Sequence, residues 1–492
     1  MVNKLFYGDN LEVLRRHIKG ESVDLCYIDP PFNSKRNYNQ IYNNVGREDR
    51  AQAQAFIDTW TWDNLANQGL AEILENYEGK FTSQSIDLIT GLTKVLGKDS
   101  LLAYLISMTL RVAEIYRVLK PMGSFYLHCD PTASHYLKLV LDAVFCPQGG
   151  NFQNEIIWCY KLGGRPRNGF PKKHDVIFLY TKSEDFKFFS DAIRVPYESD
   201  GGYVKSGRKI VKGKEYKINP LGKVPEDWWL ISALNRQSKE RLGYPTQKPE
   251  ALLEPIIKAS SDRGDVVLDA YCGCGTTVAV SQRLDRKWIG IDITYQSISL
   301  ILKRLEDSFG EGVLAEIELN GIPKDMDSVI ALANKQDDRT RKEFEKWAVL
   351  TYTNNRAIIN EKKGADRGID GVVYFQGDKD EPEKIILQVK SGNIKAGDIR
   401  DLQGTLTLEG AAMGIFITLK APTKAMIKTA KTAGIYQSKF MSQSLDKISI
   451  VTIEEILEEK KRLDIKLSYE VLKSAEKQKE TQGSQLKFNL DI

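Results

Sequence analysis

The stretch VVLDAYCGCGTTVAV, residues 266–280, decides the fold class of this chain. Its apolar start, which ends at Asp269, predicts a buried strand, and two alternating glycines precede a helix that begins at Thr276 or Thr277. A loop of this kind brings a ligand against bare backbone at a helix N-terminus, where free N–H groups favour an anion. The stretch is neither a Walker loop nor a complete GxGxxG motif. It predicts a ligand-binding strand-loop-helix unit, although a tight corner without a ligand would show the same pattern.

The next strand along the chain also ends in an acid. KWIGIDI, residues 287–293, places Asp292 about 20 residues after the loop, where a carboxylate can accept both hydroxyls of a ribose. Strands and helices alternate elsewhere too, at SVDLCYID (22–29), LLAYLISMTLRVAEIYRVL (101–119), GSFYLHCD (123–130) and KPEALLEPIIKASSD (248–262). This alternation predicts an α/β fold with a doubly wound, Rossmann-like parallel sheet and a nucleoside-containing cofactor at its edge.

Length and composition limit the class of protein. With 492 residues, 42% of them hydrophobic and 28% charged, the chain is long enough for two or three globular domains. The N-terminus has no basic-then-apolar leader, and no apolar run approaches the roughly 18 residues of a membrane span, so we expect a cytoplasmic protein without membrane contact. Among six cysteines only Cys272 and Cys274 lie close together, which favours neither a disulfide framework nor a zinc site.

Positive charge is concentrated between residues 161 and 245. This stretch holds 18 Lys and Arg against 10 Asp and Glu, although the net charge of the whole chain is only +4. Phenylalanine, tyrosine and tryptophan are spread through it, and cations mixed with flat rings suit a phosphate backbone and unstacked bases. We therefore interpret residues 161–240 as an inserted recognition region for nucleic acid. A lysine-rich solvated surface is the alternative interpretation.

A second motif lies far upstream. YIDPPFNSKRNY, residues 27–38, puts Asp29 at the tip of a buried strand and stiffens the backbone behind it with two prolines. YGDNLEVL (7–14), YPTQKPEALLEPIIKAS (244–260) and DAYCGCGTT (269–277) accompany it. Together the four motifs resemble the β-class of S-adenosylmethionine-dependent DNA amino-methyltransferases, in which the catalytic motif precedes the cofactor motif. The resemblance covers about residues 1–325.

The resemblance implies S-adenosylmethionine as the cofactor. It places the methionine end of the cofactor near Thr246, Lys248 and the loop 269–277. The ribose then lies at Asp292, and the adenine of the cofactor lies near Asp9. The implied cofactor-binding residues are Asp9, Thr246, Lys248, Asp269, Tyr271, Gly273, Gly275, Thr276, Thr277 and Asp292.

The resemblance makes the motif at Asp29 catalytic, and physical chemistry gives it a task. The exocyclic amino nitrogen of a base is a poor nucleophile because its lone pair is delocalised into the ring. The Asp29 carboxylate and the Pro30 carbonyl can accept both amino hydrogens and stabilise the positive charge that develops during in-line transfer. Pro30 and Pro31 fix the backbone, and Phe32 can stack on a base that is flipped out of the duplex.

The predicted target is N6 of adenine. No cysteine follows the prolines, which disfavours the covalent route to C5 of cytosine. Adenine N6 and cytosine N4 pose the same chemistry, but within the resembling families Asp at the first motif position favours adenine and Ser favours cytosine. We therefore expect adenine methylation, with N4 of cytosine as the alternative.

The last third of the chain indicates a second activity. The strand KIILQVK places Gln388 and Lys390 on one face, and Asp370 lies beside the preceding strand. An acid, a second oxygen ligand and a lysine suit Mg²⁺-assisted phosphodiester hydrolysis, with Asp370 and Gln388 as metal ligands. Residues 341–436 resemble the Mrr-like branch of the PD-(D/E)xK nucleases, and this resemblance adds Glu345 as a further acid. Many members have Glu in place of Gln388, and an amide is a weaker metal ligand than a carboxylate.

These features divide the chain into three parts. They are a methyltransferase domain at 1–335 with a helical excursion at 38–100, an Mrr-like endonuclease domain of the α/β class at 336–460, and a charged tail at 461–492. Together they predict a restriction-modification protein that methylates and cleaves DNA. The alternatives are a nuclease-like domain that only binds DNA, and a noncatalytic DNA-binding module, against which the intact DPPF and glycine motifs argue. The sequence leaves a monomer and a homodimer both open.

Overall fold

The computed structural model describes most of the chain. The described residues are 2–31, 36–44, 47–58, 60, 62–160, 167–197, 208–211, 214–217, 219–235, 238–244, 246–323, 326–333, 338–354, 357–360, 368–375, 383–437 and 444–465. The predicted catalytic Phe32 and most of the predicted tail, residues 466–492, lie outside them.

The larger sheet has nine strands within the described residues, in the order β10-β6-β7-β5-β2-β11-β12-β1-β13. Their bounds are Asn3–Tyr7 (β1), Val23–Ile28 (β2), Leu119–Cys129 (β5), Asn151–Cys159 (β6), His174–Thr181 (β7), Trp228–Leu230 (β10), Val266–Asp269 (β11), Lys287–Asp292 (β12) and Ile317–Asn320 (β13). Every neighbouring pair is parallel except the two that include β7. The predicted doubly wound α/β sheet is therefore confirmed.

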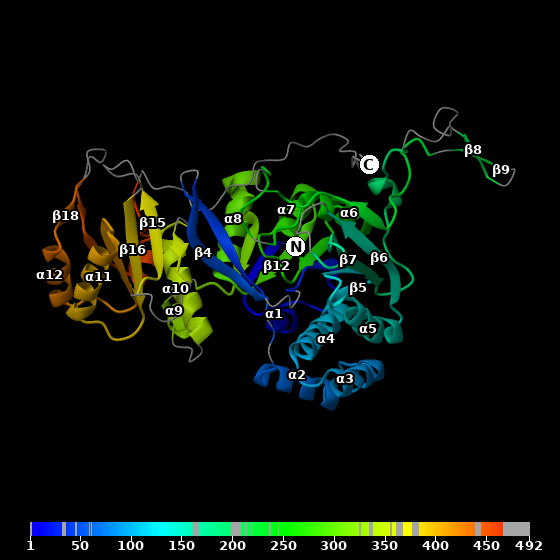
Figure 1. The fold of residues 1–492 in the computed structure, drawn as a ribbon, viewed down its shortest axis with the longest axis horizontal. Coiled ribbons are helices and arrows are strands. Elements are labelled where there is room, and N and C mark those ends of the chain that lie inside the picture. The colour runs from blue at the N-terminus through cyan, green and yellow to red at the C-terminus, as the bar shows by residue number, and fades with distance from the viewer. Residues whose placement is uncertain are drawn as a thin grey trace.

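Helices cover both faces of this sheet (Figure 1). One face carries α1 (Asn10–His17), α4 (Ser100–Val118) and α5 (Ser134–Phe145), whose apolar side chains share a core with β2 and β5. The other face carries α6 (Glu250–Ser260), α7 (Thr276–Arg283) and α8 (Tyr295–Phe309). All six residues of β2, VDLCYI, are buried, and a strand that is buried on both faces requires this double cover.

The predicted helical excursion at 38–100 is helical only in its second half. Strands β3 (Arg36–Asn44) and β4 (Arg47–Asp58) pair in antiparallel fashion, and helices α2 (Asn64–Glu75) and α3 (Ser83–Leu96) follow. The prediction is wrong for the first half because its polar, Asn- and Gln-rich sequence has no hydrophobic periodicity from which a strand can be inferred.

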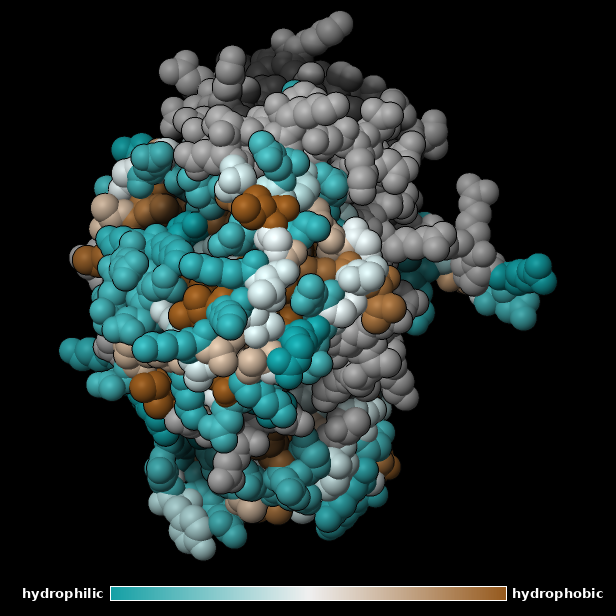
Figure 2. Space-filling model, turned by 90° about the vertical axis from the view of Figure 1, so that its left-hand side faces the viewer, coloured by the Kyte–Doolittle hydropathy of each residue, from teal (hydrophilic) through white to brown (hydrophobic). Residues whose placement is uncertain are grey.

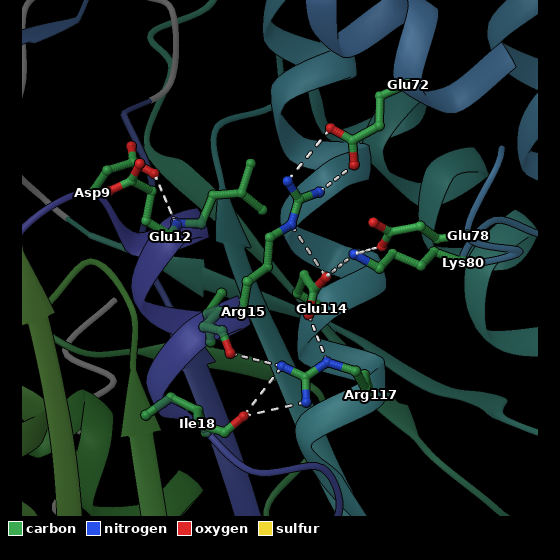
Figure 3. Close-up of polar contacts among 11 residues, drawn as sticks. Asp9, Glu12, Arg15, Ile18, Glu72, Glu78, Lys80, Glu114 and Arg117 are labelled. Atoms are coloured by element: carbon green, nitrogen blue, oxygen red, sulfur yellow. Dashed lines mark hydrogen bonds and ion pairs between the residues drawn. The ribbon is translucent and has the colours of Figure 1, made fainter. Parts of the chain in front are cut away.

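Ion pairs around the buried Glu114 connect this excursion to α1 and α4 (Figure 3). Glu114 is 3% exposed and accepts from Arg15 and from Arg117, at 3.3 and 2.6 Å, and Lys80 lies 3.6 Å away. Arg15 also pairs with Glu72 of α2. A buried carboxylate that is held by several cations is strongly destabilising to break, so the network fixes α2 against α4.

The basic region is only partly an insertion. Two of its segments, β7 and β10, are strands of the larger sheet, and the short strands β8 (Arg208–Val211) and β9 (Lys214–Lys217) pair with each other outside it. Strand β7 has the apolar run VIFLY, which the average composition of the stretch hides. The interpretation of 161–240 as one inserted unit is wrong for β7 and β10.

A smaller sheet lies at one end of the molecule (Figure 1). Its order is β14-β15-β16-β17-β20. The bounds are Ile358–Ile359 (β14), Gly371–Phe375 (β15), Glu383–Lys390 (β16), Met413–Thr418 (β17) and Ile448–Thr452 (β20), with helices α9 (Met326–Ala333), α10 (Asp338–Tyr352), α11 (Ala396–Glu409) and α12 (Lys424–Thr432). Helix α10 packs against α8, so one apolar core runs from the smaller sheet into the larger domain.

The surface of this end is mainly hydrophilic, with apolar side chains that are separate from one another (Figure 2). The exposed large apolar residues of its helices include Leu408 and Ile427. Scattered apolar residues of this kind are ordinary for a water-exposed surface. None of the described helices is both long and apolar enough to cross a membrane.

Candidate active site

The acids that the two motifs predict come together at one edge of the larger sheet. Asp29 directly follows β2, Asp269 ends β11 and Asp292 ends β12. These strands are parallel neighbours, so their carboxyl ends meet at the edge where doubly wound sheets bind ligands. Asp269 and Asp292 follow Asp29 by about 240 and 260 residues in the sequence, and the sheet brings all three to one site.

The glycine loop is fixed by backbone geometry. Gly275 has φ +73°, a conformation that favours glycine, and a Cβ atom there would lie 2.7 Å from Cγ1 of Ile301. Its N–H donates to the carbonyl of Cys272 at 2.7 Å, and α7 begins at the next residue, as predicted. Gly273, with φ +50°, turns its N–H to Oδ2 of Asp292 at 2.9 Å.

Asp292 connects this loop to the start of α8. Its Oδ1 accepts from the backbone N–H and the hydroxyl of Thr294, at 2.9 and 3.0 Å, and Thr294 is the N-cap of α8. Burial raises the pKa of Asp292 to about 6, although these hydrogen bonds and the one from Gly273 act in the opposite direction. The carboxylate is thus held in place by the protein itself.

Asp269 is buried more deeply, at 4% exposure. Its pKa is raised to about 7, first by burial and then by the nearby charges of Asp29 and Asp292, against hydrogen bonds from Thr277 and from the N–H of Tyr271. Three carboxyl groups at one strand edge repel one another, so the site favours a positively charged ligand.

Lys248 lies between the two motifs. Its ammonium forms an ion pair with Oδ2 of Asp29, and its carbonyl accepts from the hydroxyl of Thr276 at 3.2 Å. The resemblance implies a cofactor contact for Lys248, and the structure adds this link to Asp29, the predicted catalytic residue. Thr246 lies half-buried two residues earlier in the same loop.

Asp9 is the N-cap of α1 and lies two residues after the end of the neighbouring strand β1. It accepts from the N–H groups of Leu11 and Glu12, at 2.9 and 3.2 Å, and pairs with Arg111 at 3.1 Å. The next residue, Asn10, donates to the carbonyl of Ala270 at 2.8 Å and so ties α1 to the glycine loop. The sequence analysis named Asp9 but not Asn10 or Arg111. Each of these two is a polar residue on a helix face that packs against the core, and nothing else in the sequence marks it.

Sequence reasoning also missed a buried polar group beside Asp29. His128 of β5 has no exposed surface and lies between Tyr27 and Asp175, with Nδ1 2.8 Å from the Tyr27 hydroxyl and Nε2 3.2 Å from Oδ2 of Asp175. Its Nδ1 is 4.0 Å from Oδ1 of Asp29. The signal was one histidine and one aspartate beside the apolar runs FYL of β5 and VIFLY of β7.

The electrostatics of this group follow from its burial. Burial alone would raise the pKa of Asp175, but hydrogen bonding and charge interaction with His128, the charge of Lys248 and the Tyr160 hydroxyl together lower it. Burial raises the pKa of Tyr27 well above its usual value, and the charge of Asp29 raises it further. Asp175 is therefore a carboxylate and Tyr27 a neutral phenol at neutral pH.

The residues predicted for nuclease chemistry lie on the smaller sheet. Asp370 precedes β15, and its Oδ2 accepts from the N–H of Val389 at 2.7 Å. Gln388 of β16 is 7% exposed, and its Oε1 has no hydrogen-bond partner among the described residues. Lys390 ends the same strand half-buried, and Glu345 of α10 lies 3.4 Å from Lys342.

This set fits a magnesium ion poorly. The described residues contain no group of three His, Cys, Asp or Glu side chains that could hold a metal ion. Asp370 offers one carboxylate, partly used by the backbone of Val389, and Gln388 offers a neutral amide oxygen, which is the weaker ligand. No metal-dependent step follows from these residues.

Comparison with known proteins identifies the larger domain. A family model described as DNA methylase, for N6 and N4 methyltransferases, matches residues 23–303. The chain belongs to the DNA methylase family. Residues 341–458 of this methylase match a second family model, described as NACHT-associated inactive Restriction Endonuclease 1.

Curated relatives of this methylase agree with the family. The type II methyltransferase M2.DpnII of Streptococcus pneumoniae is 46% identical over 302 residues, which are 61% of this chain and 89% of that protein. M.HpaI of Haemophilus parainfluenzae is 34% identical over 256 residues, 51% of this chain and 73% of that protein. The DNA adenine methyltransferase YhdJ of Escherichia coli (strain K12) is 28% identical over 306 residues, 61% of this chain and 82% of that protein. The predicted DNA methyltransferase is confirmed.

Proposed function

We propose that this methylase transfers a methyl group from S-adenosylmethionine to N6 of adenine in double-stranded DNA and that its motif order makes it a β-class enzyme. The observation that carries the proposal is the ion pair between Lys248 and Asp29, since it brings the DPPF motif to the loop that contains the cofactor motif. The relatives named type II methyltransferases support a role in a restriction-modification system.

The residues at the strand edge fit this cofactor. S-adenosylmethionine carries a sulfonium and an ammonium group, and the carboxyl groups of Asp29, Asp269 and Asp292 form a site that suits positive charge. Burial raises the pKa values of Asp269 and Asp292. Asp292 would accept from the ribose hydroxyls, and the tight turns at Gly273 and Gly275 would let the ligand approach the backbone. When bound, the cofactor supplies an electrophilic methyl group.

Asp29 keeps one oxygen for the target base. Its Oδ2 pairs with Lys248, whereas Oδ1 faces His128 at 4.0 Å. Oδ1 and the carbonyl of Pro30 would accept the two amino hydrogens of a flipped base, which orients the nitrogen lone pair and stabilises charge as the nitrogen becomes positive. Pro30 is buried and Pro31 half-buried, so the carbonyl is held in a fixed direction.

The target base is tested by product analysis. The full chain is incubated with S-adenosylmethionine labelled in its methyl group and with genomic DNA, and the nucleosides are then separated. We expect the label in N6-methyladenine, in line with the Asp at the first motif position and with the relative named a DNA adenine methyltransferase. Label in N4-methylcytosine would contradict the adenine assignment but not the assignment of these residues to methyl transfer.

For the smaller domain we propose DNA binding without cleavage, in place of the endonuclease activity that the sequence suggests. The amide of Gln388 stands where a carboxylate ligand would be stronger, Asp370 is engaged by the backbone of Val389, and the matching family model carries the name of an inactive endonuclease. The full chain and its Asp370→Ala variant, incubated with Mg²⁺ and either methylated or unmethylated DNA, are expected to leave the DNA intact. Cleavage by the unmodified chain that is lost in the variant would establish the nuclease.

The sequence leaves both a monomer and a homodimer open, and the described residues of a single chain do not test the two. Sedimentation at several concentrations, with and without a DNA duplex, distinguishes a monomer from a dimer.

A further inference from the structure

The connection between β6 and β7 presents a phenylalanine to solvent. Residues 167–173 of this connection are described, and Phe170 is 96% exposed. A single exposed apolar side chain is ordinary on a protein surface. The position of this one, the charge around it and its backbone together indicate what it could bind.

The connection emerges at the edge of the larger sheet where Asp29 lies. Strand β5 runs parallel to β2 and β7 runs antiparallel to β5, so the start of β7 lies beside the ends of β2 and β5. The buried imidazole of His128 accordingly lies 3.2 Å from Asp175 and 4.0 Å from Asp29. Phe170 precedes Asp175 by five residues, which span at most about 17 Å when extended. The major groove of DNA is about 12 Å wide, so Phe170 and Asp29 can contact the same short stretch of one duplex.

The described part of the connection is positively charged. Arg167, Lys172 and Lys173 lie within three residues of Phe170 in the sequence, and residues 167–173 contain no Asp or Glu. Arg167 and Lys172 are exposed. This surface therefore suits a polyanion, and phosphate contacts from Lys and Arg would hold it against a DNA backbone.

The neighbours of Phe170 restrict its backbone. Gly169 has φ +106°, a conformation that favours glycine, and Pro171 disfavours the helical conformation for the residue before it. The carbonyl of Lys173 accepts from the N–H of Tyr160 at 2.9 Å and so closes the base of the connection. A ring on a restricted backbone loses little conformational freedom when it binds.

A base that is flipped into the site at Asp29 leaves a gap in the duplex. The bases on either side of the gap lose a stacking partner, which opposes the extrusion. Apolar side chains can enter a base step and occupy such a gap. We propose that Phe170 is inserted into the duplex at the position that the target base leaves, while Arg167 and Lys172 bind nearby phosphates. This inference rests on the proposed methyl-transfer function and deepens it, because it assigns a residue that keeps the target base out of the helix.

The test uses the methylated site that the product analysis identifies, in two synthetic duplexes. In one the target base is paired correctly, and in the other an abasic position stands opposite it and removes its pairing. Transfer of labelled methyl groups is measured in the first turnover, with enzyme and S-adenosylmethionine in excess over DNA. Phe170→Ala is expected to slow transfer to the paired duplex between about five- and a hundredfold, as the loss of one stack between a base and a ring predicts.

The duplex with the abasic position should rescue this variant. Less free energy opposes extrusion of an unpaired base, so insertion of a side chain is needed less. On this duplex the rate of Phe170→Ala should lie within about threefold of the rate of the unmodified protein. Phe170→Trp keeps a flat ring and should retain the original rate on both duplexes within about threefold.

Two control variants separate insertion from folding and from charge. Tyr77→Ala removes a side chain that is 89% exposed but lies between Glu75 and Glu78 in the sequence, where a phosphate backbone is disfavoured, and it should change neither rate. Lys172→Ala should weaken binding equally for both duplexes and reduce its salt dependence, because the contact is to phosphate. The melting temperature of Phe170→Ala should stay unchanged, since the side chain is almost fully exposed.

Insertion is overturned if Phe170→Ala methylates the paired duplex at the rate of the unmodified protein. It is equally overturned if the variant loses rate to the same extent on both duplexes, which would make Phe170 an ordinary DNA contact. Failure of the proposed function looks different, because the unmodified protein would then transfer no label to DNA and no methylated site would be found.

Discussion

The carboxylate of Glu343 accepts a hydrogen bond from the backbone N–H of Tyr295, at 3.2 Å, and so joins the first long helix of the smaller domain to the start of α8. Glu343 is 8% exposed, also accepts from the Tyr7 hydroxyl at 3.3 Å and pairs with Lys346 at 3.0 Å. Tyr7 and Asp292 are register partners on adjacent strands. The smaller domain therefore contacts the end of β1 and the start of α8, on either side of the predicted ribose acid Asp292.

Removing this contact should weaken both stability and cofactor binding. Glu343→Ala removes the acceptor of the buried N–H of Tyr295, which costs about 1–3 kcal/mol, and one hydrogen bond of the Tyr7 hydroxyl. We expect calorimetry to show a lower melting temperature and a larger dissociation constant for S-adenosylmethionine. Glu409→Ala, which breaks the half-exposed pair with Lys384 on the same domain, is the control and should change stability by no more than about 1 kcal/mol. Equal effects of the two variants would show that Glu343 has no special role.

Two Gly-to-Ala changes, one in the glycine loop and one in α3, should have opposite effects on stability. Gly275→Ala places a Cβ atom 2.7 Å from Ile301 at φ +73°, and the strain should cost about 1–3 kcal/mol and impair cofactor binding. Gly91 lies inside α3 with nothing within 4 Å of an added Cβ. Gly91→Ala should therefore stabilise the protein by roughly 0.5–1 kcal/mol in chemical denaturation. A stabilising Gly275→Ala would contradict the described loop.

The raised pKa values predict how pH affects the site. Asp292 and Asp269 have folded-state pKa values of about 6 and about 7, above the ordinary 3.8, so their protonated forms stabilise the ligand-free protein at low pH. This contribution is lost as the pH rises through those values. A cationic ligand needs the ionised forms, so the affinity for S-adenosylmethionine should increase between pH 5.5 and 8, by at most about tenfold per pH unit for each group.

Calorimetric titrations at several pH values check this dependence. Asp292→Asn should bind more weakly at pH 8 and show a shallower pH dependence, since one of the two titrating groups is gone. An affinity that is constant across this range, or that falls as the pH rises, would mean that neither carboxyl group faces the cofactor.

The sequence predicted which acids lie together where parallel strands carry the signal. Asp29, Asp269 and Asp292 each end an apolar run, and the topology of a doubly wound sheet places such residues together without further information. His128 and Asp175 could not be found in this way, because one polar residue in a buried strand looks like part of the core until its neighbours are known.

Other features depend on tertiary contacts that the pattern does not encode. Strands β3 and β4 have a polar sequence without periodicity, and β7 is hidden in a basic stretch whose average composition suggested a surface. Glu343 looks like one charge among several on α10, and only the packing of α10 against α8 buries it. The family resemblance gave the chemistry of Asp29, whereas the structure gave the partner, Lys248.

The most direct test of the central claim uses Asp29, which should be needed for methyl transfer and not for cofactor binding. Purified Asp29→Ala is compared with the unmodified protein for binding of S-adenosylmethionine and for transfer of labelled methyl groups to DNA. We expect a dissociation constant within a few-fold of the original and a transfer rate lower by about a hundredfold or more. A variant that binds the cofactor and still methylates DNA at the original rate would contradict the claim that Asp29 and the glycine loop form one methyl-transfer site.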